Sequence, residues 1–212
     1  MNKNNLPNNI AVFPLSDAVF FPNTILPLNI FEDRYIQLVN DCMKQERVFG
    51  MIQPKNRLNK NPEVYEVGCL GKIVSFNETR DKRFIINLSG IIRFRIKKEI
   101  NSEKLYRKFS VDYSDFLQDL KGNTSENVNY DKNHLLKKIK IFFDKINYSV
   151  SINELEKLNV DELISTICMI SPFAKEEKQK LIETIDIKDK FKILDEIISF
   201  NIFDLQENKT IQ

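Results

Sequence analysis

Several residue types that mark common classes of protein are scarce in this chain of 212 residues. Seven prolines and five glycines are too few for a collagen-like or low-complexity chain. The three cysteines, Cys42, Cys69 and Cys168, are far apart and form no C-x-x-C pair. This spacing argues against a disulfide framework or a zinc site, and it favours a reducing compartment.

The chain also lacks a long apolar run. No segment approaches the ~20 apolar residues that a membrane span needs. The segment Ala11–Phe21 is interrupted by Pro14, Ser16 and Asp17 and has no small-residue cleavage site, so it is not typical of a signal peptide. These absences predict a cytoplasmic protein with no membrane partner.

Residues for catalysis are scarce as well. The single histidine, His134, follows a polar linker, and Cys42 and Cys168 lie in apolar helical patterns, where thiols are inert. A phosphate-binding loop requires a glycine five residues before a Gly-Lys pair, with Ser or Thr after the lysine. The one Gly-Lys pair here begins at Gly71, has no glycine five residues before it and is followed by Ile73. No paired carboxylates or metal-ligand spacing stand out. We therefore predict that the chain is not an enzyme and holds no metal and no cofactor.

Composition indicates a folded chain with two structural units. Hydrophobic residues at 42% and charged residues at 29% are typical of a soluble globular protein. Residues 1–117 carry 18 Lys and Arg against 13 Asp and Glu, whereas residues 118–212 carry 14 against 17. The basic excess in the first part is too small to indicate nucleic acid by itself.

The first half shows the patterns of strands with one helix. Alternating or short apolar segments predict strands at Ile10–Phe13, Ile25–Leu28, Val48–Gln53, Phe84–Leu88, Ile92–Ile96 and Phe109–Tyr113. Turns at Thr79–Lys82 and near Gly90 would join them into an antiparallel or mixed sheet that closes on itself. Between the second and third strands, Asn29 as N-cap with Glu32 three residues later predicts a helix that ends near Gln45. Its buried stripe is Phe31, Tyr35, Leu38 and Cys42.

The second half shows only helical spacing. Residues 118–133 are polar and lack periodicity, so we interpret them as a linker. Beyond them, apolar stripes predict helices around Leu135–Ile146, Leu163–Ile170 and Ile187–Ile202, and Ser171-Pro172 suits the start of another. These helices would form a small bundle.

The order and spacing of several motifs resemble the Lon protease N-terminal domain. They are Phe13-Pro14-Leu15, Val19-Phe20-Phe21-Pro22, Leu26–Glu32 with Arg34-Tyr35, Phe49-Gly50-Met51, Val67–Gly71 and Leu88–Phe94. A closing strand near Tyr106 completes the match. The tail, with Leu163–Met169, Ser171-Pro172-Phe173 and Glu177-Lys178-Gln179, is similar to the helical part of stand-alone bacterial proteins built on this domain.

This resemblance implies an α+β fold, in which a PUA-like mixed or antiparallel β-barrel with one inserted helix is followed by a C-terminal helical bundle. We place the barrel domain at residues 8–117, the linker at 118–133 and the bundle at 134–205. The resemblance also implies the substrate-recognition part of Lon without its ATPase and peptidase parts.

The candidate partner-binding residues are Phe20, Phe21, Pro22, Phe31, Arg34, Arg93 and Arg95. The apolar members either form an exposed patch for an unfolded peptide or fill the barrel and hold the helix. Arg34 either contacts a ligand or ties the helix to a neighbouring strand, with Glu32 completing the helix cap. Arg93 and Arg95, with Lys97, form a basic strand face that suits a phosphate backbone or is the solvated face of a sheet.

The leading interpretation is a non-enzymatic module that binds unfolded or misfolded polypeptide and acts as an adaptor for a protease or chaperone partner. The mechanism would be hydrophobic capture over the barrel, helped by backbone pairing at an open strand edge. The alternative is an RNA-binding PUA-like protein. High salt would weaken binding to phosphates but not hydrophobic capture.

Overall fold

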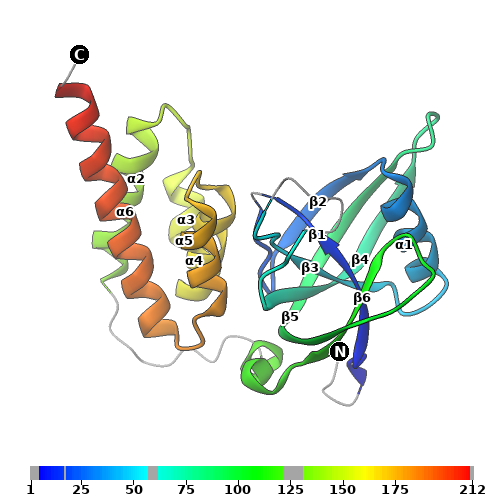
Figure 1. The fold of residues 1–212 in the computed structure, drawn as a ribbon. Coiled ribbons are helices and arrows are strands. Elements are labelled where there is room, and N and C mark those ends of the chain that lie inside the picture. The colour runs from blue at the N-terminus through cyan, green and yellow to red at the C-terminus, as the bar shows by residue number, and fades with distance from the viewer. Residues whose placement is uncertain (1–4, 17, 57–61, 122–130, 211–212) are drawn as a thin grey trace. The chain divides into compact units, whose positions relative to one another are not determined.

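A computed structural model describes residues 5–16, 18–56, 62–121 and 131–210, the last five of these by their backbone only (Figure 1). The chain divides into two compact units. The first consists of Met1–Gly122 and Ala174–Glu183, and the second consists of Asn123–Phe173 and Thr184–Gln212. Each unit is described by itself below.

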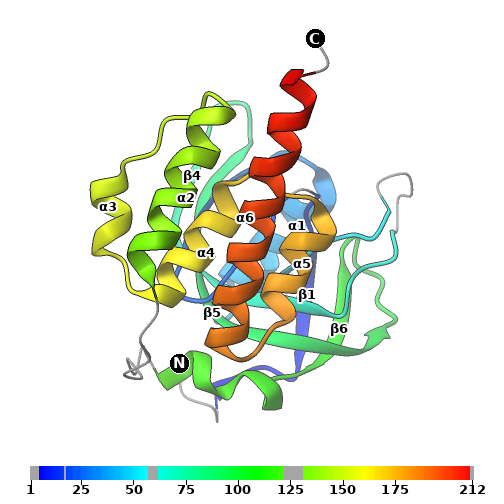
Figure 2. The same ribbon diagram turned by 90° about the vertical axis from the view of Figure 1, so that its left-hand side faces the viewer.

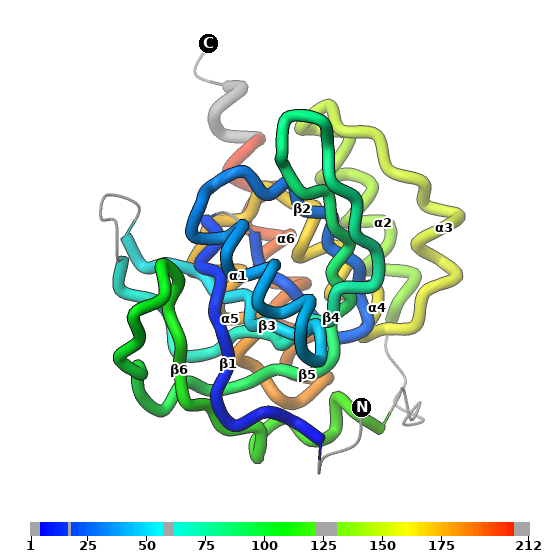
Figure 3. The backbone as a smooth tube through the Cα atoms, turned by 90° about the vertical axis from the view of Figure 1, so that its right-hand side faces the viewer, coloured from blue at the N-terminus to red at the C-terminus, as the bar shows by residue number. Residues whose placement is uncertain are grey.

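The first unit is built on a six-stranded mixed sheet. Its elements are β1 (Asn9–Pro14), β2 (Ile25–Ile30), α1 (Asp33–Met43), β3 (Val48–Ile52), β4 (Val67–Glu78), β5 (Phe84–Ile100) and β6 (Arg107–Asp112). The 17-residue β5 pairs with β2 over Phe84–Ser89, with β4 over Phe84–Arg95 and with β6 over Arg95–Ile100. The β5–β6 pairing closes the order β5-β4-β3-β1-β6 into a barrel, in which β1 and β3 are parallel (Figures 1 and 3). The predicted α+β fold with a closed mixed sheet is confirmed.

The turn predicted near Gly90 does not exist, because β5 runs through this position as one strand. Ile92 pairs with Leu70 and Gly90 pairs with Gly71, so Ile91 is an extra residue that makes a β-bulge. A Cβ at Gly90 would lie 2.0 Å from the carbonyl oxygen of Phe21. Glycine here permits a close crossing of backbone over a continuous strand rather than a reversal of the chain.

The segment that crosses Gly90 is tied to it by hydrogen bonds. The N–H of Asn23 donates to the Gly90 carbonyl at 3.0 Å, and the N–H of Gly90 donates to the Thr24 carbonyl at 2.9 Å. Asn23 has φ of 58°, a left-handed conformation that Asn tolerates better than most residues. The crossing leads the chain into β2 and holds the preceding Phe21 against the barrel.

The predicted helix forms, but its start differs from the prediction. Asn29 lies in β2 opposite Ile85, and Glu32 is the N-cap without a side-chain capping bond. The β2 ladder therefore prevails over the local capping pattern. Phe31 precedes the helix and is 64% exposed, so it is not part of the buried stripe. The rest of the stripe is buried, and the Tyr35 ring stacks on Phe13 at 3.8 Å between ring centroids.

The second unit is helical, as expected. It contains α2 (Lys132–Lys145), α3 (Ile152–Lys157), α4 (Val160–Ile170) and α6 (Ile187–Thr210), and α6 packs on both α2 and α4 (Figure 2). The core consists of Leu135, Ile139, Phe142, Phe143, Leu163, Ile167, Leu194 and Ile198. Inside this unit Lys190 is only 4% exposed, and its ammonium lies 3.0 Å from the carboxylate of Asp161.

One predicted bundle helix belongs to the first unit instead. Helix α5 (Lys175–Glu183) lies in the sequence between α4 and α6, yet it packs against β4 of the barrel. Local periodicity indicates that this segment is helical, but it does not show which surface the helix covers. Of the predicted linker, residues 118–121 form the end of the 3-10 helix η2 (Ser114–Lys121), and residues 122–130 lie outside the described ranges.

Candidate functional site

Three of the candidate residues, Phe20, Phe21 and Pro22, are buried in the barrel. Phe20 is 2% exposed and Phe21 is fully buried. The Phe20 ring fills the space over Gly71, where an added Cβ would lie 2.7 Å from the ring. A buried ring cannot contact a partner in the folded state, so the core interpretation of this segment holds and the docking interpretation does not.

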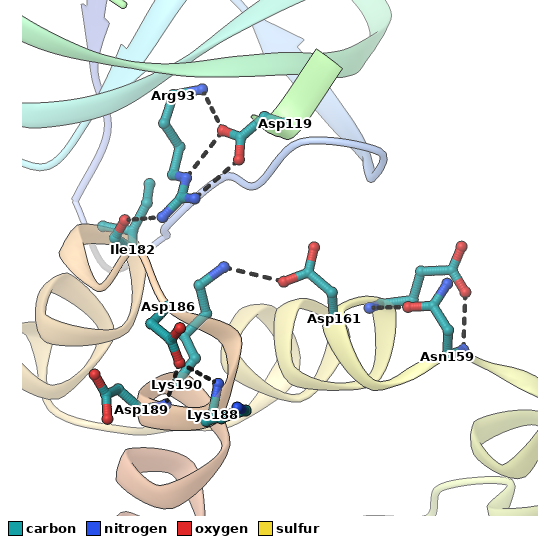
Figure 4. Close-up of polar contacts among 10 residues, drawn as sticks. Arg93, Asp119, Asn159, Asp161, Ile182, Asp186, Lys188, Asp189 and Lys190 are labelled. Carbon is teal, nitrogen blue, oxygen red and sulfur yellow. Dashed lines mark hydrogen bonds and ion pairs between the residues drawn. The ribbon is translucent and has the colours of Figure 1, made fainter. Parts of the chain in front are cut away.

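Arg93 is also internal rather than part of a basic surface. Its side chain is 2% exposed and pairs in a bidentate manner with the carboxylate of Asp119 in η2, at 2.8 Å and 3.0 Å (Figure 4). A third donation, at 3.0 Å, goes to the carbonyl oxygen of Ile182 in the last turn of α5. The guanidinium also lies 4.6 Å from the centre of the Phe116 ring. Alternation in the strand places Arg93 outward from the barrel, but η2 and α5 cover it there.

The rest of the predicted basic face is neutralised by acidic neighbours. Arg95 is an ion-pair partner of both Glu66 and Asp115, each at 3.3 Å. Lys97 lies 3.0 Å from Asp112. Phosphate contacts would have to displace these carboxylates, so the geometry does not favour a nucleic-acid groove along β5.

The remaining candidates, Phe31 and Arg34, lie at the surface where β2 ends and α1 begins. Arg34 donates from Nε to the Glu32 carboxylate at 2.9 Å, and its guanidinium carbon lies 4.5 Å from the centre of the Tyr35 ring. Glu32, two residues away in the sequence, is therefore one ion-pair partner of Arg34. Burial raises the pKa of Tyr35 to about 12, with Arg34 acting in the opposite direction. Arg34 contributes to α1 packing and leaves Phe31 as the exposed aromatic.

One face of the sheet over β2, β5 and β4, bordered by Lys72 opposite Ser89, has nine uncharged positions, of which Asn87 and Ser89 are half-buried and the rest are exposed. We call it the neutral face, and its residues are Ile25, Pro27, Asn29, Val74, Ser75, Asn77, Ile85, Asn87 and Ser89. The strand register places Asn29, Ile85 and Asn77 in one row, and Pro27, Asn87 and Ser75 in the next. Residues that alternate with them along the strands, such as Leu28 and Ile86, lie on the opposite face and are buried.

Sequence reasoning did not identify the neutral face. The alternation at Phe84–Leu88 indicates which residues are buried. The uncharged residues that alternate with them form a continuous surface only when the three strands are aligned. Ile25, Val74 and Ile85 expose 54%, 57% and 47% of their surface. The missed signal was the run of neutral outward residues on these strands, which ends at Lys72, in a chain with 29% charged residues.

The free edge of β2 borders the neutral face. Among the described residues, no strand pairs with the edge of β2 that faces away from β5. In an antiparallel pair, every second residue of a strand directs its N–H and C=O groups toward the partner strand. Thr24 does so toward Gly90 of β5, so Ile25, Pro27 and Asn29 direct their backbone groups toward the free edge. Proline has no N–H, and its ring blocks the approach of a carbonyl there. An incoming strand can therefore pair with both ends of β2 but not across its middle.

A polar cavity of about 490 Å³ lies elsewhere on the first unit, between the N-terminal segment, α1 and β6. Its lining includes Asp41, Cys42 and Tyr106. Hydrogen bonds from Lys104 and Tyr106 hold the pKa of Asp41 below its usual value, and burial raises the pKa of Cys42 to about 12. The thiol is therefore protonated at neutral pH and is a poor nucleophile. The described ranges contain no group of three His, Cys, Asp or Glu arranged to hold a metal.

Comparison with known proteins identifies the family. The profile of the ATP-dependent protease La (LON) substrate-binding domain matches residues 9–199. The chain belongs to this family. Two bacterial relatives of the Lon domain family are Lon protease 2 of Myxococcus xanthus, 26% identical over 94% of this chain, and Lon protease of Desulfosudis oleivorans, 28% identical over 88%. The chain spans about a quarter of the length of these curated relatives, 24% and 23% respectively.

Solved structures of Lon N-terminal domains have the same fold. The Lon N-terminal domain protein from Xanthomonas campestris superposes with a TM-score of 0.62 at 19% identity, covering 88% of this chain and 96% of that one. The N-terminal domain of the Mycobacterium avium complex Lon protease also gives 0.62, at 16% identity, covering 90% and 98%. Within the described ranges, no helix of this Lon-family chain is long and apolar enough to cross a membrane.

Proposed function

We propose that this chain is a non-catalytic module that recognises unfolded or misfolded polypeptide and delivers it to a protease or chaperone partner. The observation that carries the proposal is the match of residues 9–199 to a substrate-binding domain rather than to a peptidase. The substrates of an ATP-dependent protease are polypeptides, so a substrate-binding surface of this family has to accept protein chains.

The surface of the first unit supports the proposal. Phe31 is 64% exposed at the end of β2, and the neutral face begins beside it with Asn29. Exposed apolar residues next to an open strand edge suit the capture of an extended chain by side-chain contacts with partial backbone pairing. The affinity of such contacts is of micromolar order or weaker, because a flexible client loses conformational entropy when it binds.

The proposed delivery role is supported by the match to a substrate-binding domain rather than to a peptidase. The three cysteines are buried, and burial raises the pKa of Cys42 and of Cys69. We propose that bound clients are passed on rather than processed by this chain. The proposed residence is the cytoplasm, where Lon-type proteolysis would meet misfolded proteins.

Fluorescence anisotropy tests the binding step. The labelled client is a protein that is kept unfolded by reduction and carboxymethylation of its cysteines. We expect saturable binding that changes little with salt, and no binding of the same protein in its native fold. Loss of the signal with rising salt would instead indicate electrostatic capture, for which labelled RNA is the direct probe. The delivery step is tested by adding the chain to a Lon-type protease with limiting client, where faster degradation is expected and an unchanged rate argues against an adaptor.

A further inference from the structure

We infer that the neutral face is the client site of this chain and that it takes extended polypeptide segments without charged side chains. The inference rests on the proposed function and names its substrate class. Its basis is the combination of apolar area, unpaired amides and absence of charge on one exposed sheet surface.

The apolar part of the neutral face gives the binding energy. Ile25, Val74 and Ile85 come from three different strands, and each leaves about half of its surface open to water. Covering such side chains with the apolar residues of a client removes both surfaces from water, which favours association. Because the three lie on separate strands, a client that crosses the strands can contact all of them.

The amides of the neutral face match a peptide backbone. The side chains of Asn29, Asn77 and Asn87 make no hydrogen bond with other described residues. Each amide offers two donors and an acceptor, so it can bond to either the N–H or the C=O of an extended chain. Backbone contacts of this kind are independent of the client's sequence, which suits the recognition of many unfolded proteins.

The absence of charge restricts the client. A charged side chain pressed on this surface would lose water without gaining a counter-ion, which is unfavourable. Charged residues mark the ends of the face. Lys72 lies opposite Ser89 at one end, and the hairpin turn that contains Asp81 and Arg83 lies at the other. The face therefore selects a neutral segment of limited length.

The size of the face favours a single extended segment over a second copy of this chain. Three strands at a spacing of ~4.8 Å and a strand rise of ~3.3 Å per residue give a surface of roughly 200–300 Å². A stable dimer buries about 800 Å² on each partner. Pro27 also prevents two β2 edges from pairing across their middle.

Two labelled peptides test the inference on the full chain. They share the same apolar residues, and the intervening residues are serine and asparagine in one but alternating lysine and glutamate in the other, so that both have no net charge. We expect only the neutral peptide to bind. Equal binding of both peptides would overturn the client class.

Matched variants test the position of the site. Ile85 in β5 and Ile141 in α2 are both 47% exposed, so Ile85→Lys and Ile141→Lys make the same change at equal exposure on different surfaces. We expect Ile85→Lys to weaken neutral-peptide binding roughly tenfold, as for the loss of a central apolar contact, and Ile141→Lys to leave it within about twofold. The conservative Ile85→Thr, which keeps a β-branched side chain, should weaken binding less than lysine while melting at the wild-type temperature.

The outcomes separate the inference from the proposed function. If the carboxymethylated protein binds and Ile85→Lys has no effect, the neutral face is not the site and the function stands. If the wild type binds no unfolded polypeptide, both fail. If light scattering shows a dimer that Ile85→Lys dissociates, the face is an interface between copies and the inference is overturned.

Discussion

The guanidinium of Arg93 and the carboxylate of Asp119 form a buried, bidentate ion pair, although 26 residues separate them in sequence. The same guanidinium donates to the carbonyl of Ile182, 89 residues away. One side chain thus holds together the barrel strand β5, the 3-10 helix η2 and the last turn of α5. Through these contacts Arg93 stabilises the first unit, and its buried guanidinium is not exposed to a partner.

Replacing Arg93 with methionine should lower the free energy of unfolding by about 3–5 kcal/mol, because the buried Asp119 carboxylate then has no cation to balance it. Urea denaturation measures the loss. The double change Arg93→Met with Asp119→Leu should recover a large part of it, since no charge is left buried. A single variant as stable as the wild type would show that water replaces the guanidinium.

Two phenylalanines of opposite exposure should respond in opposite ways to the same substitution. Phe21→Ser removes a fully buried ring and should cost about 3 kcal/mol or more, through the cavity and the buried hydroxyl. Phe31→Ser changes a ring that is 64% exposed, so the melting temperature should stay near the wild-type value while client binding weakens by about 1–2 kcal/mol. Unchanged client affinity in a folded Phe31→Ser chain would remove Phe31 from the proposed surface.

Gly90→Ala should destabilise the barrel by at least about 1–3 kcal/mol, since the new methyl would lie 2.0 Å from the Phe21 carbonyl oxygen, which belongs to backbone and cannot rotate away. Thermal melting compares it with Ser89→Ala, the neighbouring position on the opposite face of the strand. A Gly90→Ala chain that melts with the control would mean that the crossing segment shifts at little cost.

Alkaline pH should destabilise the first unit through two buried residues of α1. Burial raises the pKa of Cys42 from 9.0 to about 12 and that of Tyr35 from 10.0 to about 12, so the folded chain holds these protons more tightly than the unfolded chain. Their contribution to stability is complete below pH 9 and is lost as the pH rises toward about 12. Urea midpoints should fall as the pH rises through this range. In Cys42→Ala the midpoint should fall less steeply with pH just above pH 9, where the Cys42 thiol of the unfolded chain begins to ionise.

Cleavage between the two halves of the sequence should not release the C-terminal fragment. A protease site inserted in residues 122–130 would leave α5 on the C-terminal fragment, where Gln179 donates to the Val67 carbonyl of the barrel at 3.2 Å. We expect the two fragments to co-elute in native gel filtration and to separate in urea. The Arg93→Met background is the control, in which the fragments should dissociate more readily.

The sequence indicates the fold well where the signals are local or where motifs fall in a known order. Most strands and helices appear close to their predicted positions, but β4 and α3 were not predicted and β5 was predicted as two strands. The resemblance in order and spacing leads to the closed mixed barrel. Two kinds of feature escape this approach. Asn29 shows a capping pattern that the ladder with β5 overrides, and Gly90 suggests a turn where a bulge lets two backbones cross. Both outcomes depend on partners that are distant in sequence.

The candidate site was harder to predict than the fold for the same reason. Alternation places Arg93 outward, yet only the tertiary structure shows that α5 and η2 cover it. The neutral face depends on the alignment of β2, β5 and β4, three strands whose outward residues have no signal in any single segment. Exposure of Phe31 depends on where α1 begins, a boundary that sequence patterns locate only within a few residues.

If the chain binds unfolded polypeptides as proposed, Pro27 has a consequence for its solubility. A bare strand edge beside an apolar surface is a template on which aggregating segments add one after another, and each added strand presents a new edge to the next. At β2 the missing N–H and the proline ring interrupt that template at its centre. Under the proposed function, a client strand would pair only with the ends of β2 and form no continuous ladder, which would keep the barrel from seeding fibrils.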